Sequence, residues 1–69
     1  MQWIETKNKL PKDCEDVLVG IKNVNSNDIH LEIGHYDYDR LNWYGFDDYP
    51  IHEFGFFVAY WMPLPKKPE

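Results

Sequence analysis

The sequence predicts an all-β fold, or a β-rich α+β fold with minimal helix, built on a small antiparallel sheet of four to five strands. The segment from Ile29 to Ile33 alternates apolar and polar residues, which is typical of a strand whose two faces differ. The segment from Val17 to Ile21 is rich in β-branched residues, which favour strands. No helical apolar period continues for about ten residues, so we expect almost no helix.

Two strands in the first half of the chain are expected to pair as a hairpin. The first covers residues 16–22, and its residues on one face are Val17, Val19 and Ile21. Residues 23–28 are rich in Asn, Ser and Asp and form the connecting loop. The second covers residues 29–36. Its apolar face consists of Ile29, Leu31 and Ile33, while His30 and Glu32 lie on the other face.

The remaining strands lie near the two ends of the chain. Residues 2–5 are a candidate edge strand, residues 41–46 a third short strand, and residues 54–62 the most apolar strand. Pro50 disfavours a central strand between the last two. We therefore expect one small β domain over residues 1–65, followed by a Pro/Lys tail at 66–69, in which Pro65 and Pro68 match a weak P-x-x-P pattern.

Length, charge and cysteine content restrict the class of protein. A chain of 69 residues has a limited core, and oligomerisation is a common remedy, so we expect a homo-oligomer. The net charge of -5 argues against direct binding of DNA, RNA or anionic membranes. Cys14 is the single cysteine, so no internal disulfide is available, which favours a cytoplasmic location. No apolar run reaches transmembrane length.

Both ends of the chain carry motifs that resemble a known family. The opening combines Trp3-Ile4, Leu10-Pro11 and Val17-Leu18-Val19, and the end reads Trp61-Met62-Pro63-Leu64-Pro65. These motifs, with Gly34, Tyr36 and Trp43 between them, resemble a small phage- and prophage-associated domain family of unknown function. Tyr60 stands where that family often has His, so no role of that His is transferred. The resemblance implies a phage context, in which small proteins often block a host defence by binding.

The candidate ligand-binding residues are aromatic or basic: Arg40, Trp43, Tyr44, Lys7 and Trp3. Aromatic rings can stack on a nucleotide base, and Arg40, the single arginine, can hold a phosphate through two parallel hydrogen bonds. The alternative for the tryptophans is that they fill the core of a small domain. For Arg40 the alternative is a surface salt bridge with Asp37 or Asp39.

Catalytic and metal chemistry have little support in the sequence. Acidic neighbours of Cys14 oppose its activation as a nucleophile, and no catalytic or phosphate-binding motif is present, so we expect no enzyme, no catalytic residue and no cofactor. His35, Asp37 and Asp39 could share one face and hold Mg²⁺ or Mn²⁺, with help from Asp47, Asp48 and His52. The favoured interpretation is that they are solvated charges at the end of a hairpin, and we predict no metal site.

Three functions remain open. The first is a phage anti-defence protein that sequesters a small nucleotide immune signal, such as a cyclic oligonucleotide, in the host-cell cytoplasm without cleaving it. The second is an acidic inhibitor whose surface at residues 28–53 blocks a basic groove on a host defence protein. The third is an accessory phage domain without a ligand.

Overall fold

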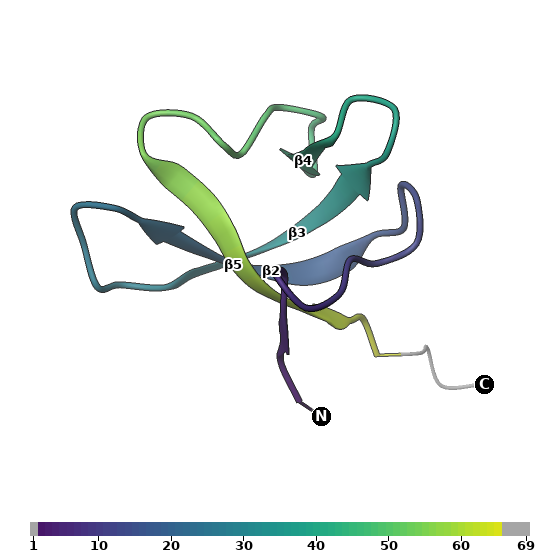
Figure 1. Ribbon diagram of the computed structural model, residues 1–69, viewed down its shortest axis with the longest axis horizontal. Coiled ribbons are helices and arrows are strands. Elements are labelled where there is room, and N and C mark those ends of the chain that lie inside the picture. The colour runs from purple at the N-terminus through teal and green to yellow at the C-terminus, as the bar shows by residue number, and fades with distance from the viewer. Residues whose placement is uncertain (1, 66–69) are drawn as a thin grey trace.

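The computed structural model describes residues 2–65, which form one five-stranded antiparallel sheet (Figure 1). The strands are β1 (Ile4–Glu5), β2 (Val17–Asn23), β3 (His30–Asp37), β4 (Asn42–Gly45) and β5 (Phe56–Pro63). Their order across the sheet is β1-β5-β2-β3-β4. The prediction of an all-β fold is confirmed, since the described residues contain no helix and so none that could cross a membrane. The tail predicted at 66–69 lies outside the described residues.

The predicted hairpin is confirmed as β2 and β3, which pair from Val17 opposite Gly34 to Ile21 opposite His30. Its connection is held by local hydrogen bonds: the side-chain oxygen of Asn23 accepts from the backbone of Asn25 at 2.9 Å, and the hydroxyl of Ser26 accepts from that of Asp28 at 3.1 Å. Such short polar side chains stabilise turns by replacing backbone partners.

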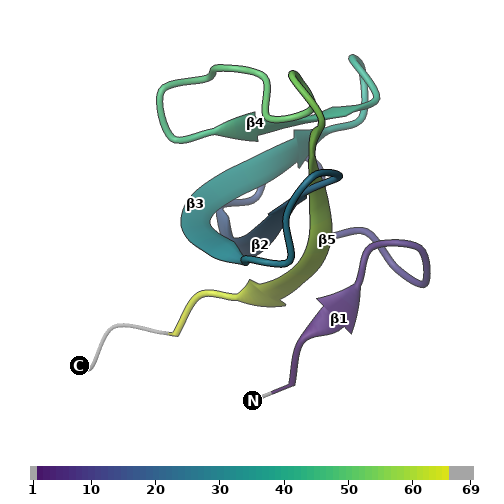
Figure 2. The ribbon, with the colours of Figure 1, turned by 90° about the vertical axis from the view of Figure 1, so that its left-hand side faces the viewer.

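The inner face of the sheet carries the core. The buried side chains that pack together are Val17, Val19, Ile21, Trp43, Ile51, Val58 and Trp61. The segment between β4 and β5 passes over this face, as Figure 2 shows from the side, and brings Ile51 into the cluster. The segment before β2 is attached at another point, because the indole nitrogen of Trp61 donates to the backbone oxygen of Lys9 at 2.9 Å. Two loops therefore close the core that one sheet cannot close alone.

The outer face of the sheet, opposite the core, is mainly apolar. Strand alternation and register place on it Leu18 and Gly20 of β2, Leu31 and Ile33 of β3, and Tyr60 of β5. The predicted alternation in β3 is confirmed, but its apolar side lies on this outer face: Leu31 is 54% exposed and Ile33 is 37% exposed. The sequence pattern therefore indicated two different faces without indicating which one is covered.

The two borders of the sheet are made differently. Beyond β1, the backbone nitrogen of Thr6 donates to the oxygen of Ala59 at 3.1 Å, beside an irregularity where β5 has one extra residue relative to β2. At the other border, β4 is paired on its free side by the loop that follows it. Ile51 donates to the oxygen of Trp43 at 3.0 Å, and Gly45 donates to the oxygen of Tyr49 at 2.8 Å.

Candidate functional site

A groove with a volume of about 480 Å³ lies on the outer face of the sheet. It is lined by Trp3, Gly20, Ile29, Leu31 and Tyr60. Pockets of about 300–1,000 Å³ that are mainly apolar and partly aromatic are typical of small-ligand sites. Gly20, Leu31 and Tyr60 belong to the sheet, whereas Trp3 and Ile29 flank it just before β1 and β3.

Gly20 forms the floor of the groove. A Cβ atom at this position would lie 3.5 Å from Ile29 and 3.6 Å from Tyr60, which is ordinary contact, so the backbone does not require glycine there. Without a side chain, Gly20 leaves space between its neighbours on β3 and β5. A flat ring placed in this space would contact the tyrosine ring on one side and apolar side chains on the other. The missing side chain thus creates the hollow.

The charges nearest the groove favour an anionic group. The Nζ atom of Lys22, two residues after Gly20 on β2, lies 5.9 Å from the centre of the Tyr60 ring. Glu5 is paired with Tyr60 across β1 and β5, and its carboxylate lies 3.5 Å from the Nζ atom of Lys7. Because Lys7 offsets the Glu5 carboxylate, Lys22 adds a positive charge beside the Tyr60 ring.

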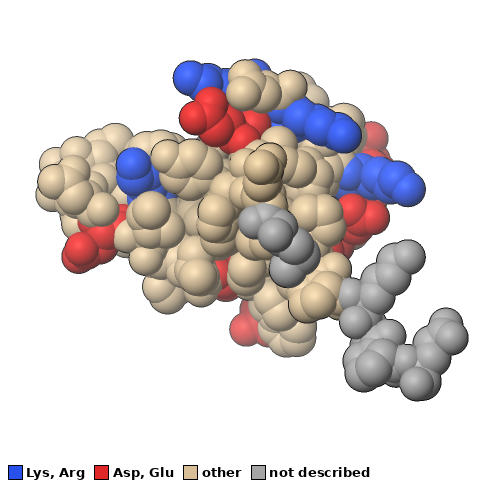
Figure 3. Space-filling view, turned by 90° about the horizontal axis from the view of Figure 1, so that it is seen from below, with Lys and Arg blue, Asp and Glu red and all other residues tan. Residues whose placement is uncertain are grey.

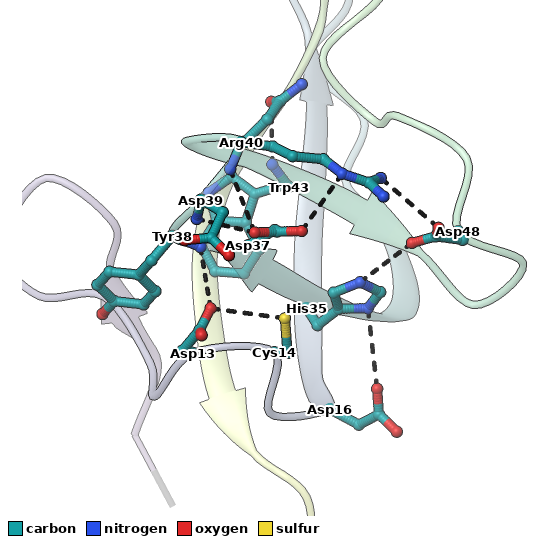
Figure 4. Close-up of polar contacts among 11 residues, drawn as sticks. Asp13, Cys14, Asp16, His35, Asp37, Tyr38, Asp39, Arg40, Trp43 and Asp48 are labelled. Carbon is teal, nitrogen blue, oxygen red and sulfur yellow. Dashed lines mark hydrogen bonds and ion pairs between the residues drawn. The ribbon is translucent and has the colours of Figure 1, made fainter.

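A second group of polar side chains lies at the other border of the sheet (Figure 4). Arg40 stacks over Tyr44, with 4.8 Å from its guanidinium carbon to the ring centre. Its nitrogen atoms lie 3.5 Å from an oxygen of Asp37 and 3.6 Å from an oxygen of Asp48. Hydrogen bonding with Tyr44 and the charge of Asp48 raise the pKa of Arg40. Arg40 therefore already has two anionic partners within the chain.

His35 lies beside the same cluster. Its two ring nitrogens lie 3.9 Å from an oxygen of Asp16 and 3.4 Å from an oxygen of Asp48, and its ring stacks on Tyr44 at 6.0 Å between centres. Asp37 is used differently: one of its oxygens accepts hydrogen bonds from the backbone of Asp39 and Arg40 in the turn after β3. The sequence suggested a possible metal site made of His35, Asp37 and Asp39. In the structure these residues take part in separate contacts.

Among the described residues, Asp13, Cys14 and Asp37 form a group whose ligand atoms lie within 4.8 Å of one another. The thiol of Cys14 lies 3.5 Å from an oxygen of Asp13. Partial desolvation and the Asp13 carboxylate raise the pKa of the Cys14 thiol above its ordinary value. A raised pKa keeps the thiol protonated at neutral pH, which opposes nucleophilic chemistry there.

The structure separates the five predicted ligand-binding residues. Trp3 lines the groove, and Lys7 lies beside it as the partner of Glu5. Arg40 and Tyr44 lie at the β4 border, four strand spacings or about 19 Å from β1. One small ligand bound on Trp3 therefore does not reach Arg40.

The prediction that Trp43 offers an open face for stacking is wrong. Trp43 is 3% exposed and packs edge-to-face on Tyr36, with 5.2 Å between ring centres. The reason is register: Trp43 lies opposite Tyr36 on the inner face of the sheet, where the loop carrying Ile51 covers it. Its alternative role as a core residue is the one observed. Sequence reasoning missed Gly20, Tyr60 and Lys22 as residues of the groove. For Gly20 a signal was present, namely the alternation in β2 and β3.

A comparison with family models matches residues 2–69 to a family described as "Protein of unknown function (DUF551)". No curated protein and no solved structure matches the chain.

Proposed function

The chain belongs to the DUF551 family of proteins of unknown function, and from that premise we propose that it is a non-catalytic binding protein that captures a small nucleotide in the groove on its outer face. The observation that carries the proposal is the pair of aromatic residues that line the groove, Trp3 and Tyr60, beside the space left by Gly20. Stacking of a base on an aromatic side chain contributes about 1–3 kcal/mol.

Lys22 supports an anionic ligand over a neutral one. Its ammonium group lies beside the Tyr60 ring, so a base stacked on that ring would bring its phosphate near a positive charge. The neighbouring Glu5 is offset by Lys7, which reduces repulsion of a phosphate. The net charge of -5 opposes long nucleic acids more strongly than a ligand with one or two phosphates, because repulsion increases with the number of charges brought close.

The role in a cell follows from the resemblance to phage-associated domains. A phage protein that binds a cyclic oligonucleotide without cleaving it would lower the concentration of that immune signal. This role needs affinity but no catalytic group. The same groove can take a linear mononucleotide, and the ligand panel below distinguishes the two.

Isothermal titration against linear and cyclic mono-, di- and trinucleotides tests the proposal. We expect one member of the panel to bind, and Trp3→Ala to weaken it about fivefold to about 150-fold, which corresponds to about 1–3 kcal/mol. Lys22→Ala should also weaken binding. The difference in affinity between this variant and the wild type should be larger at low salt, because the lost contact is electrostatic and salt screens it.

Two control variants change similar residues elsewhere. Phe46→Ala removes an aromatic side chain that is 74% exposed after β4, and Lys12→Ala removes an exposed lysine from the loop before β2. Both should bind as the wild type does. Absence of binding across the panel, or equal affinity in Trp3→Ala and wild type, would contradict nucleotide capture.

A second candidate is the acidic inhibitor of a basic protein surface. It is favoured by the carboxylates at the end of β3, where Asp13, Asp16, Asp37 and Asp48 lie near one arginine and one histidine. A pull-down from host lysate, repeated at high salt, tests it, because a charge-driven contact weakens as salt screens it. A protein retained at low salt by wild type and lost with Asp16→Asn plus Asp48→Asn would support this function. If neither ligand nor partner binds, an accessory phage domain remains.

A further inference from the structure

The outer face of the sheet exposes a group of apolar side chains. Its exposed apolar side chains are contiguous: Trp3 is 42% exposed, Ile29 51% and Leu31 54%, and all three line the same groove. Single exposed apolar residues are ordinary on protein surfaces, whereas contiguous patches of several hundred Å² mark interaction sites. We propose that a second copy of this chain packs its outer face on this one, sheet against sheet, with the two grooves facing each other across the contact.

The charge pattern fits the centre and margin of such a contact. The middle of the outer face consists of uncharged residues from three strands: Leu18, Gly20, Leu31, Ile33 and Tyr60. Figure 3 shows a broad uncharged area with Lys, Arg, Asp and Glu mostly toward its outline. Depletion of charge at the centre and polar residues at the rim are features of protein interfaces.

The size of the face is that of a small interface. β2, β3 and β5 contain seven or eight residues each. At about 3.4 Å per residue and about 4.8 Å per strand, three such strands cover about 27 by 14 Å, or about 380 Å² in projection. Trp3, before β1, adds to this area. Side chains make the accessible area larger than its projection, which brings it near the range of weak to standard interfaces, about 600–800 Å² per partner.

A second copy is favoured over an unrelated occupant for two reasons. A domain of 69 residues has a limited core, and self-association buries further apolar surface. A two-fold contact also keeps the acidic groups of two copies apart. Leu31 and Asp37 lie six residues apart on β3, or about 20 Å along the strand. A two-fold axis that passes near Leu31 and runs across the strands therefore directs the two acidic ends away from each other, beyond the screening length of about 8 Å.

The dimer goes beyond the proposed function, and its test uses no nucleotide. Sedimentation velocity of the full chain between about 1 and about 100 μM should show a shift from one to two chains. Leu31→Glu places a charge at the centre of the contact and should raise the dimer Kd at least about tenfold. Ile29→Thr keeps a β-branched residue and should weaken the dimer in the same direction, which covers the case in which Leu31→Glu fails to fold.

Leu41→Glu is the matched control. Leu41 is 72% exposed in the turn between β3 and β4, away from the groove, so this variant should dimerise as the wild type does. A mass of one chain at every concentration would overturn the proposal. So would a dimer that both folded variants, Leu31→Glu and Ile29→Thr, leave at wild-type strength.

Discussion

Gly34 in β3 and Gly45 in β4 lie directly opposite each other across the two strands. A Cβ atom at Gly34 would lie 2.9 Å from the backbone oxygen of Tyr44, and one at Gly45 would lie 2.5 Å from the ring of Tyr49. Because Gly34 has no side chain, it leaves room for the backbone of β4, and because Gly45 has none, it leaves room for the Tyr49 ring. Gly45 therefore lets the segment that closes the core lie close to the sheet.

Gly34→Ala should destabilise the fold by about 1–3 kcal/mol, because the added methyl group meets backbone that cannot rotate away. Gly20→Ala is the matched control: its Cβ makes contacts of 3.5–3.7 Å, so the free energy of unfolding should be unchanged or slightly higher. Urea unfolding followed by tryptophan fluorescence measures both. Equal stability in the two variants would show that the Gly34 site can relax.

Trp61→Ala should lower the free energy of unfolding by about 3–5 kcal/mol, because it leaves a cavity in the core. Trp61 is 4% exposed, and its indole nitrogen bonds the backbone of Lys9. Trp61→Phe should cost less, since a ring remains and mainly the hydrogen bond is lost. Trp3→Ala, at a partly exposed position, should change thermal unfolding least of the three. A Trp61→Ala protein that melts as the wild type does would contradict the core role of this residue.

His52 should make stability depend on pH. Its Nε2 atom accepts a hydrogen bond from the backbone of Val58 at 3.0 Å, and burial lowers the pKa of His52 below its ordinary value of 6.5. The folded chain thus binds this proton less readily than the unfolded chain. The contribution of His52 is complete above pH 6.5 and is lost as the pH falls below 6.5 and through the folded pKa.

His52→Gln removes the titrating group at the same position and is the comparison for this pH dependence. Unfolding free energies of both proteins from about pH 8 to about pH 5 should converge as the pH falls, because the wild type loses its advantage. Other histidines are present in both proteins and cancel in the difference. A constant difference across this range would show that protonation of His52 does not affect folding.

Arg40→Ala should change neither nucleotide affinity nor dimerisation. Arg40 lies at the β4 border beside Asp37 and Asp48, and the groove lies between β1, β5, β2 and β3. The melting temperature should change little, because surface ion pairs contribute little to stability. Titration of wild type and Arg40→Ala against the same nucleotide checks this. A marked loss of affinity would instead place the ligand on the Arg40 and Tyr44 pair.

Much of the fold could be predicted from local patterns. The alternation from Ile29 to Ile33 and the β-branched run from Val17 to Ile21 predicted the central hairpin, which is confirmed. The short edge strand at residues 2–5 is confirmed as β1. The covered side of β3 could not be predicted, because it depends on where the loop after β4 packs. That loop covers Gly34 and Trp43, so the aliphatic side chains of β3 are left on the opposite face.

The candidate site was harder to predict for the same reason. The aromatic character of Trp43 was evident in the sequence, but its exposure depended on the register that places it opposite Tyr36. The groove depends on Gly20 and Tyr60, forty residues apart in the chain and adjacent across β2 and β5. Only the pairing of those strands shows that the space above one residue lies beside the ring of the other.

The way the two borders of the sheet are occupied limits how these chains can aggregate. An unpaired strand at a border invites further strands to add, which is the step that extends fibrils. Here the border strand β1 has two residues, and the free side of β4 is bonded to Tyr49 and Ile51. Addition of a strand at β4 would first require the loop over the core to detach. Growth at the β4 border is therefore coupled to partial unfolding, while β1 offers only two residues for pairing, and the folded chain should remain dispersed at concentrations where a destabilised variant such as Trp61→Ala forms fibrils.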